Sequence, residues 1–311
     1  MRQFSYTVPE AWDGTSVNAF ARGFAGMSMR FVRSVKFLPE GIMVNGQHAT
    51  TRHVLHAGDE IIFTVPDEHN EYVIPTPGEV KIIWENEDLV LVDKAPGLVV
   101  HPCHGHYDDT LLNHLAWHYK EKNEQHLLRP VGRLDKDTSG LLFVAKNRYA
   151  VREMEKQRER NALHRTYLAL AEGRVGDPGD HGMIDRPIGP VPGDKNLYQV
   201  CEEGRPSRTT YEVLDIKECF AGEEQAVVSL VRLQLETGRT HQIRVHMAWL
   251  GHPLVGDPFY GHAGLLGMKR AALHSSRITG HLPGSGEDFD FSSPLPDDML
   301  AILRFHPKEW R

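Results

Sequence analysis

Residues 129–147 read RPVGRLDKDTSGLLFVAKN, a stretch that runs from charged, turn-forming residues into an apolar segment. Glycine and hydroxyl residues recur before the segment LLFVA, which has the composition of a buried strand. Two carboxylates, Asp135 and Asp137, lie among Arg129, Arg133 and Lys136. They are candidates for metal ligands, for a general acid–base pair or for turn caps, and at least one of them is expected to be a cap. Their spacing of two residues does not distinguish between them.

Further strands and helices are expected on both sides of this stretch, so that residues 78–311 read as one mixed domain. Strand patterns occur in KIIWE, DLVLVDK, LLFVAK, TYLALAEG, TTYEVLDI and AVVSLVRLQLE, and helical patterns occur near residues 108–120, 147–161 and 239–250. The predicted fold class is therefore α+β.

Residues 1–66 are predicted to form a separate, small α/β module. Apolar side chains recur every three or four positions in residues 14–39, which predicts one or two short helices. The basic residues on these helices include Arg30, Arg33 and Lys36. Asn45-Gly46 is a strong hairpin signal. Prolines and acidic residues then predict a linker over residues 67–77.

Composition excludes several classes of protein. The chain has 311 residues, of which 40% are hydrophobic, and a formal net charge of -7. It contains no run of about 18 apolar residues, and its first residues lack the pattern of a signal peptide. We therefore expect a cytosolic protein without membrane contact. Cys103, Cys201 and Cys219 are far apart and form no CxxC pair, so reduced thiols are expected.

The negative net charge conceals three basic blocks. Lys and Arg exceed Asp and Glu by four in residues 14–39, by five in residues 129–174 and by four in residues 228–277. Binding to a nucleic acid backbone requires such cations. A surface with alternating patches would give the same pattern, so the blocks favour a nucleic acid partner only modestly.

Residues 101–109, HPCHGHYDD, contain a potential metal motif. His104, His106 and Asp108 have the order that opens a zinc-binding loop in metallo-hydrolases. The next position holds Asp109 where such a loop has His, and the remaining histidines show no matching spacing. A loop that leads into a helix is the favoured interpretation, so no metal is expected, and a metal-dependent hydrolase is the weaker alternative.

Residues 233–261 contain the end of a strand followed by a helix. The inner face of this helix is expected to hold Ile243, Met247 and Leu250, and the candidates for its cap are Thr237 and Thr240. Arg239 and Arg244 lie near the start of the helix, either at the surface or in a cleft. An arginine buried in a cleft requires a carboxylate partner, because an unpaired charge is costly to desolvate.

Five separated motifs occur in a characteristic order: DLVLVDKAPGLVVHP, GRLDKDTSGLLFVAKN, HRTYLALAEG, ETGRTHQIRVHMAWLGHPLVGDPFYG and RAALHS. In this order they resemble the RluA family of pseudouridine synthases over about residues 80–280, and the preceding module resembles an S-four type RNA-binding domain. The resemblance implies a large mixed, mainly antiparallel sheet with flanking helices and a catalytic cleft. It also implies an isomerase that needs neither a cofactor nor a metal.

The resemblance assigns roles to single residues. Asp135 matches the catalytic aspartate, Tyr167 the tyrosine stacked against the target uracil, and Arg244 the arginine paired with that aspartate. Arg133 matches the arginine that helps to extrude the nucleotide, and Leu273 is a wall of the pocket. The residues expected to contact RNA are Arg30, Arg33, Lys36, Arg133, Arg165 and Arg239.

Two positions depart from the family pattern. The family usually has His where this chain has Gly132, and Lys where it has Arg165. Gly132 removes a side chain beside the RNA path and is expected to affect target choice, whereas Arg165 keeps the charge.

The implied reaction breaks the N-glycosidic bond of a uridine and joins carbon 5 of the uracil to the same ribose. Asp135 acts at the sugar, either as a nucleophile or by removing a proton. The expected partner is structured RNA, with large-subunit ribosomal RNA as the favoured target and transfer RNA as the second candidate. The protein is expected to be a monomer. A catalytically silent RNA-binding or ribosome assembly factor is the alternative, but it would not require Asp135, Tyr167 and Arg244 together.

Overall fold

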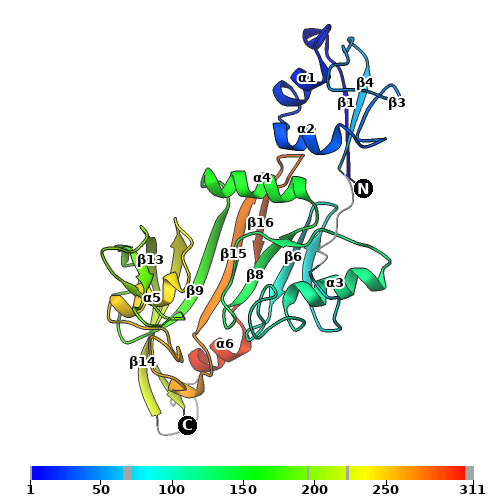
Figure 1. The fold of residues 1–311 in the computed structure, drawn as a ribbon. Coiled ribbons are helices and arrows are strands. Elements are labelled where there is room, and N and C mark those ends of the chain that lie inside the picture. The colour runs from blue at the N-terminus through cyan, green and yellow to red at the C-terminus, as the bar shows by residue number, and fades with distance from the viewer. Residues whose placement is uncertain (1, 66–71, 195, 222–223, 305–311) are drawn as a thin grey trace.

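The computed structural model describes residues 2–65, 72–194, 196–221 and 224–304, and Figure 1 shows how its elements are arranged. Separate sheets and separate hydrophobic cores divide the described chain into two parts. We call residues 2–65 the N-terminal unit and the described residues from 72 to 304 the C-terminal unit.

The N-terminal unit is a four-stranded sheet, ordered β1-β4-β2-β3, with two short α-helices. Its elements are β1 (Arg2–Thr7), η1 (Glu10–Trp12), α1 (Val17–Gly23), α2 (Met29–Val35), β2 (Ile42–Val44), β3 (Gln47–His48) and β4 (Glu60–Val65). Ser16 and Ser28 cap the two α-helices by accepting hydrogen bonds from backbone N–H groups. Asn45 and Gly46 both have positive φ, 46° and 75°, as a two-residue hairpin turn requires. The predicted helices and hairpin are confirmed.

The N-terminal unit has its own core, and an aromatic side chain of β1 contacts one of α4. Phe20 and Val32 from the helices pack with Ile61 and other strand residues. The rings of Phe4 and Tyr149 lie 4.4 Å apart. Residues 66–71 lie outside the described residues, so the expected linker over residues 67–77 can be followed only from residue 72, where the chain forms neither helix nor strand.

The C-terminal unit is built on a ten-stranded sheet with the main order β10-β13-β14-β9-β15-β8-β6-β5. Its strands are β5 (Lys81–Glu85), β6 (Leu89–Lys94), β7 (Arg129–Pro130), β8 (Ser139–Ala145), β9 (His164–Glu172), β10 (His181–Asp185), β13 (Arg208–Ala221), β14 (Glu224–Leu235), β15 (Leu273–His281) and β16 (Asp288–Ser292). β8 and β15 pair in parallel, and the other described strand pairs of this sheet are antiparallel. The predicted mixed, mainly antiparallel sheet is confirmed.

Three helices of the C-terminal unit, α3, α4 and α5, lie where their patterns predicted them, whereas α6 was not predicted. The remaining elements are α3 (Leu111–Glu121), α4 (Arg148–Glu159), β11 (Ile188–Pro190), β12 (Tyr198–Val200), α5 (Gln242–Trp249), η2 (Leu265–Gly267) and α6 (Asp297–Arg304). No helix in the described part of the chain has both the length and the apolar character needed to span a bilayer.

Strand β8 shows why an uninterrupted apolar run follows the Asp135 segment. Every residue of β8 is buried. Leu142 and Val144 enter the core that includes α3, whereas Leu141 and Phe143 enter the core that includes α4. Successive side chains of a strand point to opposite faces, so a strand covered on both faces must be apolar throughout. Because β8 lies between β15 and β6, the loop before it, which carries Asp135, begins at the centre of the sheet.

Candidate active site

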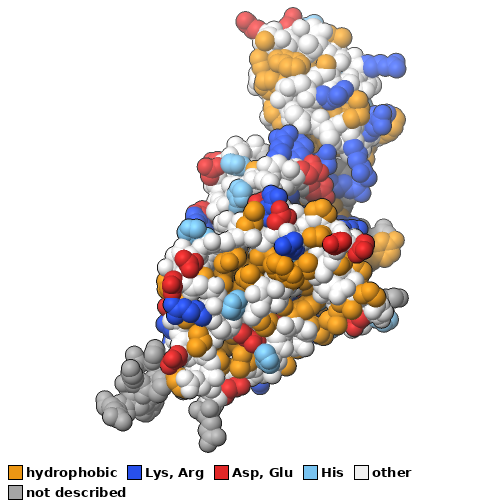
Figure 2. Space-filling model, turned by 90° about the vertical axis from the view of Figure 1, so that its left-hand side faces the viewer, with side chains coloured by type: hydrophobic (Ala, Val, Ile, Leu, Met, Phe, Trp, Pro, Cys, Tyr) orange, Lys and Arg blue, Asp and Glu red, His pale blue; other side chains and the backbone are white. Residues whose placement is uncertain are grey.

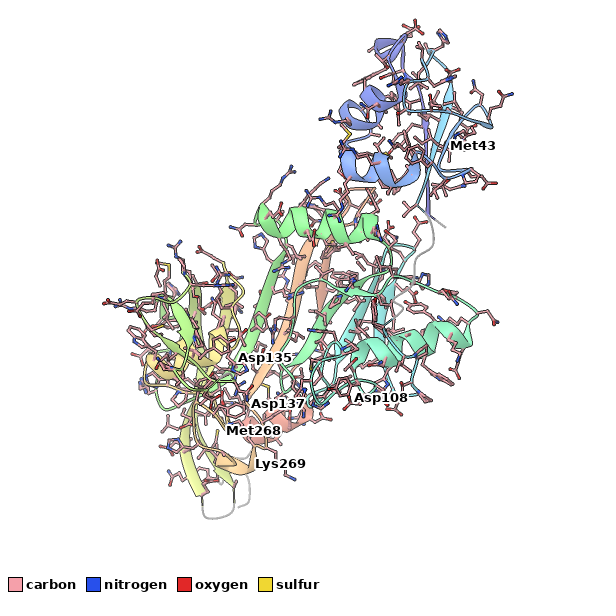
Figure 3. The ribbon with its side chains drawn as sticks, in the orientation of Figure 1. Met43, Asp108, Asp135, Asp137, Met268 and Lys269 are labelled. Carbon is pink, nitrogen blue, oxygen red and sulfur yellow. The ribbon has the colours of Figure 1, made fainter. Side chains whose placement is uncertain are left out.

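One cavity of about 1040 Å³ in the C-terminal unit brings together most of the residues singled out from the sequence. The loop of residues 132–138, the end of α4, the start of β9 and residues 235–244 contribute to its wall. The predicted site residues that line it are Arg133, Asp135, Arg165, Tyr167, Arg239, Arg244 and Leu273. Figure 3 shows Asp135 below α4 beside the central strands, with Asp108 away from it on the side of α3.

A buried lysine holds the loop that carries Asp135. Lys94, the last residue of β6, donates from Nζ at 2.8 to 2.9 Å to the backbone carbonyls of Ala95, Leu98 and Lys136. Burial lowers the pKa of Lys94 to about 7, and the nearby Asp137 and Asp135 carboxylates oppose that shift. The carbonyl of Lys136 adjoins Asp135, so this ammonium group ties the loop to the end of the strand.

A buried arginine holds the same loop from the other side. Arg270 donates from Nη1 to the carbonyl of Asp137 at 3.0 Å, and its Nε and Nη2 bind the carboxylate of Asp298 at 2.7 and 2.9 Å. Asp137 itself lines a different cavity, with Lys269 and Arg270. The structure therefore separates the two carboxylates that spacing alone could not distinguish, because only Asp135 lines the cavity that contains Tyr167.

Asp135 is partly accessible and weakly paired. Its side chain is 17% exposed, and its nearest cation is Nη2 of Arg133, at 4.0 Å from Oδ1. Arg133 is 57% exposed and lies at the edge of the cavity. No hydrogen bond joins the Asp135 carboxylate to another described residue, so its oxygen atoms are available for a ligand.

Arg244 pairs with Asp257, and the expectation that it pairs with Asp135 is wrong. Its Nε and Nη2 donate to the two carboxylate oxygens of Asp257, each at 2.6 Å. The side chains are 4% and 0% exposed. Burial acts to lower the pKa of Arg244, but the hydrogen bonds and charge of Asp257 outweigh it and raise that pKa, with a further contribution from the charge of Asp135. Asp257 can reach Arg244 because the turn that follows Asp257 folds back onto α5.

That turn also fixes Asp257 itself. Oδ1 of Asp257 accepts hydrogen bonds from the backbone N–H groups of Phe259 and Tyr260, at 2.9 and 3.2 Å. The guanidinium of Arg244 lies 5.4 and 5.1 Å from the centroids of the same two rings. Asp257 lies in the quoted motif GDPFYG, but sequence reasoning assigned it no role.

His241 is the N-terminal cap residue of α5, so the prediction that Thr237 or Thr240 caps this helix is wrong. His241 has φ of 56°, a left-handed conformation that is uncommon for a residue with a side chain. Thr237 instead donates from Oγ1 to the side chain of Gln242, whose Oε1 also accepts from the backbone N–H of Arg239. These contacts fix the segment that leads to Arg244.

His241 and Tyr260 form a further pair on the cavity side of α5. Nδ1 of His241 and Oη of Tyr260 are 2.9 Å apart, and the backbone N–H of Tyr198 donates to the same hydroxyl at 3.0 Å. Burial lowers the pKa of His241, although the charge of Asp135 opposes this shift, and burial raises the pKa of Tyr260. Both groups are therefore neutral near pH 7. Neither had been singled out from the sequence.

Tyr167 and Leu273 form the apolar part of the cavity wall. Tyr167 lies on β9 opposite Leu233 of β14 and Ser275 of β15, and both Tyr167 and Leu273 are buried in the same core. A flat aromatic side chain in such a wall is suited to stacking on a planar ligand. The cavity thus combines an accessible carboxylate, a flat apolar wall and several guanidinium groups.

The predicted basic residues of the N-terminal unit do not reach this cavity. Arg33 and Lys36 line a separate cavity of about 440 Å³ together with Arg52, which sequence reasoning missed, whereas Arg30 does not line it. In the C-terminal unit, Arg239 lines the main cavity and donates from Nε to the Pro206 carbonyl at 3.3 Å.

The segment HPCHGHYDD forms the loop before α3, as the favoured interpretation predicted. Nδ1 of His106 lies 2.7 Å from Oδ2 of Asp109, and the hydroxyl of Tyr107 lies 3.5 Å from Nδ1 of His104. Within the part of the chain that the structure describes, no three His, Cys, Asp or Glu side chains group as ligands of one metal ion. The arrangement does not support the metallo-hydrolase alternative.

Comparison with known proteins gives one consistent family. The family model described as RNA pseudouridylate synthase matches residues 88–249. The uncharacterized RNA pseudouridine synthase YlyB of Bacillus subtilis is 37% identical over 265 residues, covering 84% of this chain and 84% of the relative. The ribosomal large subunit pseudouridine synthase D of Nitrosomonas europaea is 37% identical over 276 residues, covering 85% of this chain and 76% of the relative.

Solved structures agree with the sequence relatives. The structure of human RNA Pseudouridylate Synthase Domain Containing 1 is similar with a TM-score of 0.56 and 29% identity, over 70% of this chain and 86% of that chain. Human RNA Pseudouridylate Synthase Domain Containing 4, at 22% identity and a TM-score of 0.55, shares the fold over 72% of this chain and 91% of that chain. The cavity with Asp135, the fold and the relatives therefore lead to one conclusion: the chain belongs to the RNA pseudouridylate synthase family.

Proposed function

We propose that the chain isomerises specific uridines of large-subunit ribosomal RNA to pseudouridine, with Asp135 as the catalytic residue. The observation that carries this proposal is the convergence of Asp135, Tyr167 and Arg244 on one cavity from three separate segments of the chain. Relatives named ribosomal large subunit pseudouridine synthase D support the choice of RNA, and transfer RNA is the second candidate.

The reaction exchanges one bond for another at C1′ of the ribose. The bond from C1′ to N1 of uracil breaks and the bond from C1′ to C5 forms. The hydrogen on C5 leaves as a proton and N1 takes up a proton, so the product is an isomer of the substrate. The Asp135 carboxylate would act at the sugar, as a nucleophile at C1′ or as a base that removes a sugar proton. Either role requires oxygen atoms that no other side chain occupies, which fits the weak pairing of Asp135.

The remaining residues of the cavity suit a base that has left its stack. Tyr167 would stack on the extruded uracil, and Leu273 would close the apolar side of the pocket. Arg133, exposed at the edge of the cavity, would enter the space that the base leaves behind. Arg244, fixed by Asp257, would supply positive charge beside the reacting sugar and carboxylate.

The N-terminal unit would bind RNA outside the catalytic cavity. Its cavity is lined by Arg33, Lys36 and Arg52 together with hydroxyl and amide groups, a combination suited to phosphate oxygens. The resemblance of residues 1–66 to an S-four type RNA-binding domain supports this role, with Arg30 as an additional contact. We expect a monomer in the cytosol, where ribosomal RNA is available.

A mapping experiment tests the function and the target together. The gene is deleted in its host, and pseudouridines are mapped at nucleotide resolution in ribosomal and transfer RNA. We expect defined sites of large-subunit RNA to be lost and then restored by the wild-type gene. Asp135→Asn should fail to restore them, because an amide can neither attack C1′ nor serve as the base.

Asp137→Asn is the matched control, because this carboxylate lies two residues away and lines a different cavity. It should restore the modification. Restoration by Asp135→Asn would refute the role of Asp135, and sites lost from transfer RNA alone would refute the proposed target.

A further inference from the structure

Gly132 and Arg165 lie against each other in the wall of the main cavity. Gly132 has φ of +78°, and a Cβ built at this position would lie 2.8 Å from Nη1 of Arg165. Carbon and nitrogen atoms that are not bonded do not approach so closely in a packed interior. The guanidinium therefore occupies the space that a side chain at position 132 would need.

The protein satisfies few of the donors of Arg165. An arginine has five N–H donors. Among the described residues, the hydrogen bond of this side chain is the one from Nη2 to the backbone carbonyl of Val131, and Nε is buried without a partner. No carboxylate of the described chain forms a salt bridge with it. A partly buried guanidinium with unused donors is suited to bind an anionic ligand.

The position of Arg165 on β9 indicates which ligand group it meets. Arg165 and Tyr167 are two residues apart on one strand, so their side chains emerge on the same face at roughly 7 Å spacing. Both line the catalytic cavity. In a nucleotide, the base and the phosphate are separated by a distance of this order. A nucleotide whose base stacks on Tyr167 can therefore place a phosphate oxygen near Arg165.

We propose that Arg165 binds a phosphate of the nucleotide whose base enters the cavity, and that Gly132 is required because it leaves room for the guanidinium. The inference rests on the function proposed above. The two positions are then coupled, because the guanidinium of Arg165 fills the space that a side chain at position 132 would occupy. Arg165 acts in substrate binding and leaves the bond exchange at C1′ to Asp135.

The coupling can be measured with single and double variants. The substrate is ribosomal RNA from the gene-deleted strain, labelled with tritium at C5 of uridine, which releases tritium as pseudouridine forms. Arg165→Met should raise KM about 10-fold to 100-fold with kcat within about threefold of the wild type, because a charge-assisted contact to the substrate is lost. Gly132→Ala should raise KM similarly, because the new methyl group displaces the flexible guanidinium.

The double variant Gly132→Ala/Arg165→Met should have the KM of Arg165→Met alone, because no guanidinium remains to be displaced. Gly264→Ala is the matched control for backbone strain, since Gly264 has φ of +79° and nothing within 4 Å of its Cβ position. It should change thermal stability as Gly132→Ala does and leave KM unchanged.

Three outcomes would overturn the inference while the wild type remains active. These are additive effects of the two substitutions on KM, an unchanged KM in Gly132→Ala, and a loss in Arg165→Met that falls on kcat alone. A wild-type enzyme that releases no tritium from any site of this RNA would instead refute the proposed ribosomal substrate.

Discussion

Arg244 forms its ion pair with Asp257 and so does not occupy the carboxylate oxygens of Asp135. A bidentate arginine on Asp135 would occupy the oxygen atoms that a nucleophile or base must use. Arg244 is held by Asp257 instead, at 2.6 Å to each oxygen, while its charge still interacts with Asp135. Asp257 is therefore a positioning residue: it neutralises a buried guanidinium and fixes its direction.

Asp257→Asn should destabilise the C-terminal unit by about 3–5 kcal/mol, because it leaves the buried charge of Arg244 without its counterion. It should also lower kcat, since Arg244 is no longer fixed beside the cavity. Urea unfolding and tritium release at saturating RNA measure the two effects.

Glu212→Gln is the control for this prediction. Glu212 pairs with Arg232 at 2.7 Å, but the two side chains are 38% and 45% exposed. Water and salt screen such a pair, so its loss should cost less than about 1 kcal/mol. Equal losses of unfolding free energy in Asp257→Asn and Glu212→Gln would show that burial does not determine how much the Arg244–Asp257 pair stabilises the protein.

At the scale of elements, the loop of residues 132–138 is held by two buried basic side chains from separate segments of the chain. Lys94 at the end of β6 and Arg270 just before β15 bind the carbonyls of Lys136 and Asp137. These carbonyls are internal to the loop and have no partner in the sheet ladder. The cations thus replace the hydrogen bonds that a regular element would supply.

Lys94 should make stability depend on pH, and Lys94→Met should remove that dependence. Its pKa in the folded chain is about 7, below the ordinary lysine value. Between pH 7 and about 10.4 the unfolded chain binds one more proton, so the free energy of unfolding rises with pH, by at most about 1.4 kcal/mol per unit. We expect the wild type to gain stability relative to Lys94→Met from pH 7 to pH 9 in urea unfolding.

Lys120→Met is the control, because Lys120 is exposed on α3. Its difference from the wild type should not change over the same pH range. A pH-independent difference for Lys94→Met as well would mean that the three carbonyls keep the ammonium fully charged across the range.

Many of the elements could be predicted from the sequence because their signals are local, although β10, β15, β16 and α6 were not predicted. The apolar runs of β6, β8 and β9 and the stripes of the α-helices reflect burial of residues near one another in the chain. The contacts that complete the site are not local. Lys94 binds a carbonyl 42 residues away, and Arg270 binds one 133 residues away. Only the folded sheet brings such groups together, so no spacing in the sequence could show them.

The error over Arg244 has the same origin. The requirement for a carboxylate partner was correct, since a buried guanidinium without one is costly. The choice between Asp135 and Asp257 depends on how the turn after β14 and α5 folds back, which periodicity does not describe. The helix cap at His241 was missed because a left-handed histidine is rare and has no sequence signal.

At the scale of the whole molecule, the Lys and Arg side chains that we propose contact RNA lie in two units with separate cores. Figure 2 shows Lys and Arg side chains over the N-terminal unit and at its junction with the C-terminal unit on this face. Arg33, Lys36 and Arg52 line one cavity, and Arg133, Arg158, Arg165 and Arg239 line the other. An acidic net charge of -7 is compatible with RNA binding because binding depends on the local charge, and basic side chains gather in these two cavities.

This division predicts that phosphate binding and chemistry can be separated by mutation. Arg33→Gln/Lys36→Gln should flatten the slope of log affinity against log salt concentration by roughly 1.5 to 2, as expected for the loss of two phosphate contacts. At saturating RNA, kcat should be unchanged, because the cavity that contains Asp135 is intact.

Arg22→Gln is the control, because Arg22 lies on α1 but does not line the N-terminal cavity, and it should leave the slope unchanged. An unaltered slope in the double variant would show that the N-terminal cavity does not meet phosphate, and a lower kcat at saturation would show that the two units act on the same step.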